Sequence, residues 1–506
     1  MLHIIIKKGV TSLKDFAGKQ DVMTMRRTGS IIVLVLALAV VFGGCDELNG
    51  TDEGNEEGTN SSPATPAVPA GITTGRIDST YSFSTSATDP DTDAVSIRFD
   101  WGDGAMSEWS EFVASGTEVT ATHAFTAAGT YQVKAMAKDG EGAQSDWSGT
   151  HQVTIEGLPG WHFVGTQSFS PGQVGELALE FHDGTPYVAF QDYVNGYGAT
   201  VMYFDGSSWV NLGTPGFTSG GAYGLSFAID GNGTPWVAYS DDSSLANVMK
   251  YNGSAWVQVG AAGFSEGAIT SPSIAMYNTT PYVAYGDDYY ADQGGYDHKA
   301  VVKMFNGTSW VLVGSAGFTG SEASSTSMAI SSGGTPYVGF SDWAYANPFE
   351  FGKATVVKFD GSDWGAVGTA GFTAGEVRQT DLTLYGDQPY LAFRDASDGA
   401  TVMTFTGSAW EPVGAETFSS GSIDFPSLTV VDGTPWISFK DNANESKCTV
   451  MQFDGASWVV CGEAGFSPDW IDFSSIAIED GEPWVAFKDN QFQGSTAGLI
   501  TVMVYR

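Results

Sequence analysis

The sequence predicts an all-β protein in which a small β-sandwich is followed by a seven-bladed β-propeller with split-blade closure. Two observations predict this class. Gly (65) and aromatic residues are abundant, and short alternating apolar segments are separated by turn residues along most of the chain, whereas long amphipathic helical patterns are not visible. A unit marked by a tryptophan also recurs seven times after residue 160. Since the chain has 506 residues, we expect more than one hydrophobic core.

The charge balance excludes one class of partner. The chain carries 58 acidic and 21 basic side chains, for a net charge of -37. Nucleic-acid binding requires Lys and Arg to displace counterions from phosphates, so a nucleic-acid partner is not expected. The acidic surface is instead typical of a soluble protein outside the cytoplasm.

Residues 1–45 predict an upstream extension and a lipoprotein signal peptide. Arg26 and Arg27 precede an apolar run over 31–42, and small residues follow it. A membrane-spanning helix needs about 20 apolar residues, so this run predicts an export signal rather than a permanent span. We expect translation to begin at Met23 or Met25.

The residues Phe-Gly-Gly-Cys that end at Cys45 resemble a bacterial lipobox. The resemblance implies cleavage before Cys45 and acylation of its thiol. The protein is therefore expected in the cell envelope, anchored by lipid alone, in the periplasm or on the cell surface. Residues 46–71 are first acidic and then rich in Ser, Thr and Pro, which predicts a disordered tether.

Residues 72–156 predict a small β-sandwich. Strand-like alternation runs over Val95–Phe99 and Thr130–Met136. The segments Phe99-Asp-Trp-Gly-Asp-Gly104 and Gly129-Thr-Tyr-Gln-Val resemble a PKD domain, an immunoglobulin-like sandwich, over about 85 residues. The resemblance implies a spacer or adhesion module on an exported protein.

Two groups of residues in the chain bear on metal and disulfide content. Asp89, Asp91 and Asp93 have the carboxylate spacing of a calcium site, although Asx turns explain the same pattern. No other cofactor is expected. Cys448 and Cys461 lie diagonally across a predicted hairpin at roughly 7 to 8 Å, beyond comfortable disulfide reach, so we expect free thiols.

Residues 157–506 predict the propeller. Each unit holds four short apolar or alternating segments, which is typical of a propeller blade, and Asp-Gly or Asn-Gly turns join most third and fourth segments. The units recur about every 46 to 54 residues. Their marker tryptophans are Trp161, Trp209, Trp256, Trp310, Trp364, Trp410 and Trp458.

The two ends of the array predict how the ring closes. The array begins with a single strand of the outer type, Trp161–Val164, and stops after a strand of the third type, Thr501–Tyr505. We therefore expect the first strand to complete the last blade, which would pair two otherwise open edges.

Two further positions recur in every unit, and we interpret both as architectural. An Asp follows each second strand and is expected to cap the chain where it leaves the sheet. A Phe follows each outer strand and is expected between blades. These residues are Asp192, Asp241, Asp287, Asp342, Asp395, Asp441 and Asp489, and Phe169, Phe217, Phe264, Phe318, Phe372, Phe418 and Phe466.

Function is expected where the blades differ, because loops on a rigid scaffold vary without disturbing packing. The long loops after the second strands of the third and fourth units carry aromatic rings that could stack on sugars. The tentative ligand-binding residues are Tyr289, Tyr290, Tyr296, Trp343, Tyr345 and Phe349. These rings could equally pack within their own loops.

The sequence thus favours a non-catalytic binding protein, expected to be a monomer, whose partner is a glycan or another envelope protein. The alternative is a propeller glycoside hydrolase or lyase acting on an extracellular polysaccharide. No His-Glu-x-x-His motif or three-arginine clamp is present. Catalysis by a pair of carboxylates that the fold brings together stays an open alternative.

Overall fold

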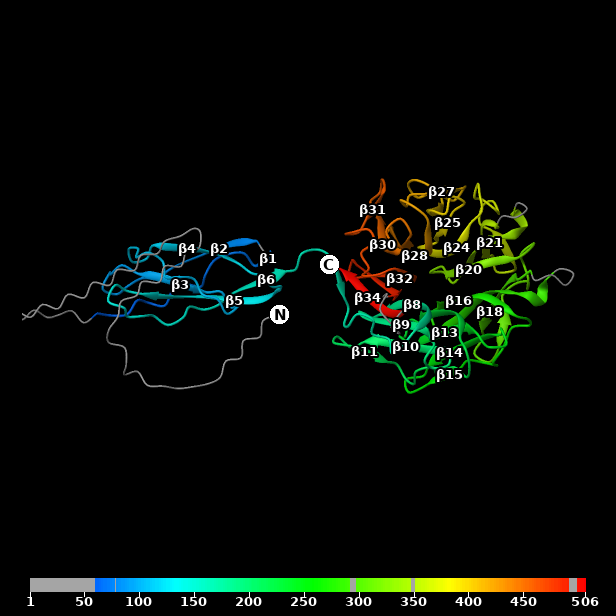
Figure 1. Ribbon diagram of the computed structural model, residues 1–506, viewed down its shortest axis with the longest axis horizontal. Coiled ribbons are helices and arrows are strands. Elements are labelled where there is room, and N and C mark those ends of the chain that lie inside the picture. Colours follow the sequence, from blue (N-terminus) through cyan, green and yellow to red (C-terminus); the bar gives the residue numbers. More distant parts are fainter. Residues whose placement is uncertain (1–59, 78, 292–296, 347–350, 491–497) are drawn as a thin grey trace, which may run out of the picture. The chain divides into compact units, whose positions relative to one another are not determined.

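The computed structural model describes residues 60–77, 79–291, 297–346, 351–490 and 498–506. The described residues form strands and short 3-10 turns, without an α-helix among them (Figure 1). The predicted signal peptide and the predicted lipidation site, Cys45, lie outside these ranges.

Two sheets make up the sandwich. One has the order β1-β6-β5-β3 and the other pairs β2 with β4. Phe83, Phe99, Trp101 and Phe125 are fully buried in its core, and the Trp101 ring stacks on Phe99 at 5.2 Å. The strands are β1 (Thr74–Arg76), β2 (Thr80–Ser86), β3 (Ser96–Asp100), β4 (Glu118–Ala124), β5 (Gly129–Lys138) and β6 (His151–Glu156).

The sandwich begins earlier than the sequence predicted. The backbone N–H groups of Ala64 and Ala67 donate to Thr88 and Ser86, and Ala70 forms a bridge with Ser84. The intervening prolines, Pro63, Pro66 and Pro69, are buried. A proline at every third residue suits an extended chain with three residues per turn, which presents all three rings to one side. The segment predicted as the end of the tether therefore lies along the sandwich.

The carboxylate of Asp89 organises the turn that was considered for calcium. It accepts the backbone N–H groups of Asp91 at 2.8 Å and Asp93 at 3.3 Å. This is the geometry of an Asx turn. Asp103 makes a comparable local contact with His123 at 2.7 Å, and although burial acts to raise the pKa of Asp103, this hydrogen bond lowers it overall.

Residues 161–506 form a β-propeller, and their described strands make seven four-stranded antiparallel sheets, here called blades 1 to 7. Blade 1 comprises β8 (Val174–His182), β9 (Thr185–Asp192), β10 (Gly198–Phe204) and β11 (Trp209–Asn211). Blade 2 comprises β12 (Tyr223–Ile229), β13 (Pro235–Ser240), β14 (Ala246–Tyr251) and β15 (Trp256–Gln258). Blade 3 comprises β16 (Ile269–Tyr277), β17 (Thr280–Asp287), β18 (Lys299–Phe305) and β19 (Trp310–Leu312). Blade 4 comprises β20 (Ala323–Ile330), β21 (Pro336–Asp342), β22 (Lys353–Phe359) and β23 (Trp364–Ala366).

Blade 5 comprises β24 (Arg378–Tyr385), β25 (Gln388–Arg394), β26 (Ala400–Phe405) and β27 (Trp410–Pro412). Blade 6 comprises β28 (Ile423–Val431), β29 (Thr434–Asp441), β30 (Lys447–Phe453) and β31 (Trp458–Val460). Blade 7 comprises β32 (Ile471–Glu479), β33 (Glu482–Asp489), β34 (Leu499–Tyr505) and β7 (Trp161–Phe163). The first strands lie around the centre of the disk and the fourth strands at its rim (Figure 1).

The ring closes by the pairing that the sequence predicted. β7 pairs antiparallel with β34, with Trp161 opposite Tyr505. β32 also contacts β8, so the first strands of neighbouring blades touch all the way round. The two ends of the array therefore share one hydrophobic core, in which Val164 and Val174 pack with Ile500 and Val504.

A belt of indole and phenyl rings repeats in all seven blades. Each marker tryptophan donates its indole N–H to a backbone carbonyl of the preceding blade, as Trp256 does to Leu212 at 2.7 Å and Trp161 to Cys461 at 3.1 Å. Each recurring Phe stacks on a marker tryptophan, as Phe217 does on Trp256 at 4.1 Å. The predicted place of these Phe residues between blades is confirmed. Cys448 and Cys461 are free thiols, also as predicted.

The propeller has two unlike faces, which we name for their connections. The loop face carries the loops from second to third strands and the connections between blades. The hairpin face carries the tight turns from first to second and from third to fourth strands, such as Asp360-Gly361 between β22 and β23.

Candidate functional site

The recurring Asp residues are structural caps, as the sequence predicted. Asp192 accepts the backbone N–H groups of Val194 and Asn195, and its second oxygen accepts the Thr200 hydroxyl at 2.9 Å. Equivalent backbone bonds form in blades 2 to 6; Asp395, for instance, accepts the N–H of Ser397 at 2.8 Å. We therefore do not place a functional site at this position.

The aromatic residues predicted from the third and fourth units stand in two short 3-10 turns, η1 (Asp288–Tyr290) and η3 (Trp343–Tyr345). Tyr289 is 66% exposed and Tyr345 45% exposed, and both are open to a ligand. Tyr290 instead packs against Gly317 and the core of its blade. Trp343 is held by a bond from its indole N–H to the Ser324 hydroxyl at 3.0 Å. The remaining two, Tyr296 and Phe349, lie outside the described residues.

These two turns do not merge into one aromatic cluster. Tyr289 and Tyr290 contact each other at 5.2 Å, and Trp343 contacts Phe351 at 5.4 Å, but among the described residues no ring of one turn contacts a ring of the other. The sequence alone could not decide this, because the distance between the two loops depends on how the blades are arranged.

The mouth of the central channel on the loop face is where the blades differ most. In each blade a residue at the start of the first strand lies beside the residue that precedes the capping Asp, and we call these seven pairs the mouth pairs. They are Gly175/Gln191, Tyr223/Ser240, Thr270/Gly286, Ser324/Ser341, Arg378/Arg394, Asp424/Lys440 and Asp472/Lys488. The pairs of blades 1 to 4 are uncharged, whereas every member of the pairs of blades 5 to 7 is charged.

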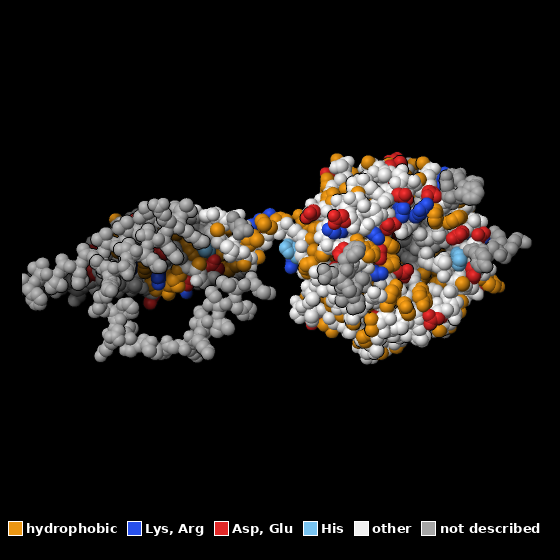
Figure 2. Space-filling model, viewed as in Figure 1, with side chains coloured by type: hydrophobic (Ala, Val, Ile, Leu, Met, Phe, Trp, Pro, Cys, Tyr) orange, Lys and Arg blue, Asp and Glu red, His pale blue; other side chains and the backbone are white. Residues whose placement is uncertain are grey.

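Ion pairs run from blade to blade through the charged half. Arg394 binds Asp424 at 2.6 Å, and Lys440 binds Asp472 at 3.0 Å. Lys488 approaches the same Asp472 at 3.7 Å. Figure 2 shows basic and acidic side chains near a hollow in the middle of the propeller. A count of arginines in the sequence does not reveal this cluster, because two of its three basic residues are lysines. Arg394, Lys440 and Lys488 nevertheless occupy the same position of the repeat.

Buried polar atoms without a partner lie among the mouth pairs. Gln191 is 6% exposed and Ser341 is 1% exposed, yet the Gln191 Nε2 and the Ser341 Oγ make no hydrogen bond within the described chain. The Arg378 Nε is also buried and makes no hydrogen bond within the described chain. Since buried polar groups in proteins are nearly always satisfied, these atoms indicate that a ligand or solvent completes the mouth.

Exposed rings stand beside the charged half, in the loop between β9 and β10 of blade 1. Tyr193 and Tyr197 are 36% and 49% exposed, with ring centroids 4.9 Å apart. Partial burial and then the nearby Tyr197, Glu176 and Asp472 raise the pKa of Tyr193. Because Gly175 has no side chain, Gln191 and Tyr193 can lie over it. A Cβ at this position would stand 2.2 Å from the Gln191 Oε1.

Below the mouth, a polar channel runs between the first strands. Its cavity of about 410 Å³ is lined largely by hydroxyls, with Glu180 of β8 and Asp381 of β24 as its two carboxylic acids. Hydroxyls of the first strands accept backbone N–H groups of the next blade, as Ser475 does from Leu179 at 3.0 Å. Asp381 takes the place of such a serine and accepts the N–H of Leu428 at 2.7 Å.

Glu180 departs most clearly from the repeat, because Ala or Thr stands at the same position in every other blade. Burial, and then the negative charge of Asp381, raise the pKa of Glu180 to about 7. Burial also raises the pKa of Asp381. A carboxylic acid held neutral beside a second carboxyl group has the chemistry of a proton donor.

Neither a metal cluster nor a membrane-spanning helix is found among the described residues. Among the described residues no group of three or more His, Cys, Asp or Glu side chains is arranged to hold a metal ion. Within the same ranges no helix has the length and apolar character needed to cross a membrane.

Comparisons with known proteins agree with the sandwich and leave the propeller unassigned. The PKD domain family matches residues 61–155. The PKD domain of an M14-like peptidase from a Thermoplasmatales archaeon is 39% identical over 19% of this chain and 98% of that chain, with a TM-score of 0.18. No curated protein matches the chain.

Solved structures that resemble the propeller are more distant. A lectin from Aleuria aurantia in complex with Fucalpha1-6GlcNAc is 15% identical over 60% of this chain and all (100%) of that chain, with a TM-score of 0.40. A sialidase from Trypanosoma rangeli in complex with sialic acid is 11% identical over 69% of this chain and 59% of that chain, with a TM-score of 0.38. These likenesses are too weak to assign a function.

Proposed function

Residues 61–155 belong to the PKD domain family, and from this premise and the mouth of the propeller we propose an exported binding protein that takes a glycan at the loop face. The observation that carries the proposal is the set of unpartnered buried polar atoms of Gln191, Ser341 and Arg378 around the channel mouth. Sugar hydroxyls both donate and accept hydrogen bonds, so they match such mixed groups.

The rings of the loop between β9 and β10 support the same ligand class. Tyr193 and Tyr197 offer flat apolar surface beside the charged Asp472. The C–H face of a sugar ring can lie on tyrosine while its hydroxyls reach the carboxylate. An envelope protein as partner is the competing interpretation, and it would use the same exposed rings as interface anchors.

A glycan array followed by titration calorimetry tests the proposal. We expect binding of the intact chain to at least one glycan, and a loss of affinity of about tenfold in Gln191→Ala and Tyr193→Ala. The matched control is Tyr385→Ala on the hairpin side of β24, which is 45% exposed and should bind like the parent. Unchanged affinity in both mouth variants would contradict the proposal, and capture of an envelope protein through the same residues would favour the competing partner.

Glu180 and Asp381 favour one alternative, a glycoside hydrolase. Glycosidases use a carboxylic acid and a carboxylate on either side of the scissile bond, and both groups line the channel cavity. Chromogenic glycosides test this directly. Hydrolysis that disappears in Glu180→Gln would establish the enzyme, whereas no turnover of any glycoside would leave the binding function.

The lipid anchor remains a proposal that rests on the lipobox-like sequence before Cys45. Mass spectrometry of the protein from membranes is expected to find acyl chains on the Cys45 thiol. Release of the protein into the soluble fraction in Cys45→Ser would support the anchor, and unchanged membrane association would contradict it.

A further inference from the structure

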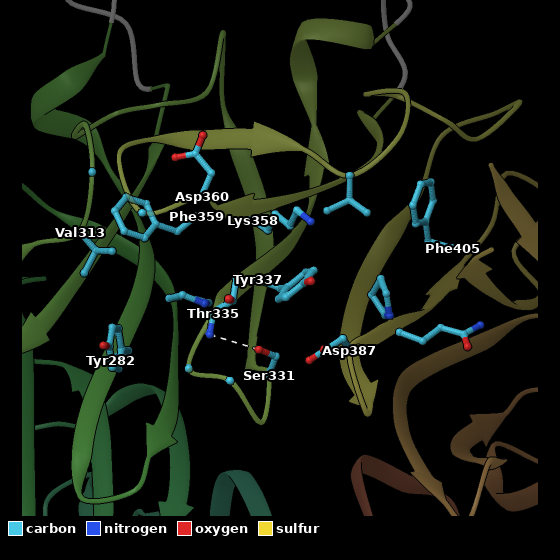
Figure 3. A pocket seen from close by; sticks show the side chains of 18 of the residues that line it. Tyr282, Val313, Ser331, Thr335, Tyr337, Lys358, Phe359, Asp360, Asp387 and Phe405 are labelled. Carbon is cyan, nitrogen blue, oxygen red and sulfur yellow. Dashed lines mark hydrogen bonds between the residues drawn. The ribbon is translucent and has the colours of Figure 1, made fainter. Parts of the chain in front are cut away.

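The hairpin face carries grooves between neighbouring blades, on the opposite side from the proposed mouth site. The largest cavity described, about 1440 Å³, is lined by blades 3, 4 and 5. It joins two grooves that flank blade 4 (Figure 3). A smaller cavity of about 590 Å³ lies between blades 1 and 2.

One position of the second strand carries tyrosine in blades 1, 3, 4 and 5 and tryptophan in blades 2, 6 and 7, and the tyrosine of blade 5, Tyr390, is buried. Tyr187, Tyr282 and Tyr337 stand at this position where the cavities are found. Trp occupies it in blades 2, 6 and 7, and the larger ring fills the space. Trp484, for example, meets Phe181 of blade 1 at 5.2 Å. Tyrosine therefore leaves room that tryptophan would occupy.

The groove between blades 4 and 5 also departs from the repeat in its polar groups. The turn before β25 reads Gly-Asp-Gln-Pro, whereas blades 1 and 6 read Asp-Gly-Thr-Pro at this turn. Asp387 and Gln388 thus replace the usual Gly and Thr on one wall of the groove. On the other wall stand Tyr337 and Lys358, and within the described chain no ion pair joins Lys358 to Asp387.

These walls match the chemistry of a sugar polymer better than that of a peptide. Tyr282, Tyr337 and Phe405 come from three successive blades, and Lys358 and Asp387 stand between them (Figure 3). The walls consist of strand faces and hairpin turns whose backbone groups are already paired, so no strand edge is offered for peptide addition. The charged lining residues are Lys358, Asp360 and Asp387, which leave a net charge of only -1 and suit a neutral ligand.

We propose that the two joined grooves beside blade 4 form a second binding cleft, for a neutral oligosaccharide that lies across the hairpin turns of blade 4. The cavity exceeds the roughly 300 to 1,000 Å³ typical of drug-sized ligands, as a chain of several sugars requires. The rings of Tyr282 and Tyr337 stack on sugars in the two grooves. Asp387, Gln388 and Lys358 bind hydroxyls of the sugars near blade 5.

The repeat itself supplies test variants that should fold. Tyr337→Trp places in blade 4 the residue that blades 2, 6 and 7 already carry at this position, and it fills the groove. The double variant Asp387→Gly with Gln388→Thr restores the Gly-Thr-Pro sequence that ends this turn in blades 1 and 6. Thermal melting of the intact chain checks that both variants keep the stability of the parent.

Binding is measured with neutral oligosaccharides of four to six sugars from glucan, xylan and mannan, by titration calorimetry on the intact chain. We expect at least one to bind, with a loss of affinity of about tenfold or more in each variant. Tyr385→Ala is the control, because this 45% exposed residue lies on the hairpin face outside the cavity lining, and it should leave this affinity unchanged. If Tyr193→Ala abolishes all oligosaccharide binding, the cleft is overturned while the mouth site stands.

Three other results would also overturn the cleft. The first is no binding of any of these oligosaccharides, and the second is parent-like affinity in both groove variants. The third is that the substitutions weaken binding of a peptide and not of a sugar. Loss of binding confined to the groove variants would support the cleft and leave the mouth proposal to its own test.

Discussion

The outer belt and the central mouth of the propeller differ in how faithfully they repeat. In the belt every marker tryptophan bonds the preceding blade and every recurring Phe stacks on one, from Phe169 on Trp209 to Phe466 on Trp161. At the mouth, by contrast, an uncharged half faces a half made of charged residues such as Arg378 and Lys440. The comparison teaches that a position identical in all blades maintains the ring, whereas one that differs between blades is free to bind.

The largest expected effect comes from opening the ring. Deletion of β34 removes the strand that pairs with both β33 and β7 and strips the shared core of Ile500, Val502 and Val504. We expect the propeller to lose its cooperative unfolding transition in calorimetry. Removal of Arg506 alone is the control and should preserve that transition. A propeller that melts like the parent without β34 would show that the belt holds the ring without closure.

A smaller loss is expected when one belt residue is removed. Trp256→Ala deletes a side chain that is 8% exposed, together with its bond to Leu212 and its stack on Phe217. The free energy of unfolding should fall by about 3 to 5 kcal/mol in chemical denaturation. Tyr289→Ala, at a 66% exposed position, should change it by less than about 0.5 kcal/mol. Equal effects of the two variants would erase the contrast between belt and loop face.

The smallest effect on the free energy of unfolding is expected inside the channel, where the buried carboxyl group of Glu180 lowers stability. Burial raises the pKa of Glu180 from 4.5 to about 7. Between these values the folded protein keeps a proton that the unfolded chain has released, so the free energy of unfolding decreases as the pH rises through this window. Glu180→Ala matches blades 2, 3, 4 and 7 and should raise the free energy of unfolding by about 1 to 3 kcal/mol at pH 8.

The same variant should have no stabilising effect at pH 4, where Glu180 is protonated in both states. Denaturant unfolding at the two pH values measures the difference. A stabilisation that is equal at pH 4 and pH 8 would mean that packing, not the carboxyl group, distinguishes Glu180 from alanine.

The sequence by itself determined what repeats. The Trp spacing predicted four-stranded blades, the unlike ends predicted the pairing of β7 with β34, and the equivalent Asp and Phe residues predicted caps and inter-blade packing. These features can be predicted because each depends on a position that recurs in every unit, or, for ring closure, on the strand types that the repeat leaves unmatched at its two ends.

Only the tertiary structure decided which unlike residues meet. Glu180 and Asp381 are about 200 residues apart in sequence yet line one channel, and Tyr282 and Asp387 line one cleft. Pro63, Pro66 and Pro69 read as a tether in sequence but lie buried against β2. The physical reason is that the channel and clefts form only when the ring closes, so their residues share a site through the geometry of the disk and not through any local pattern.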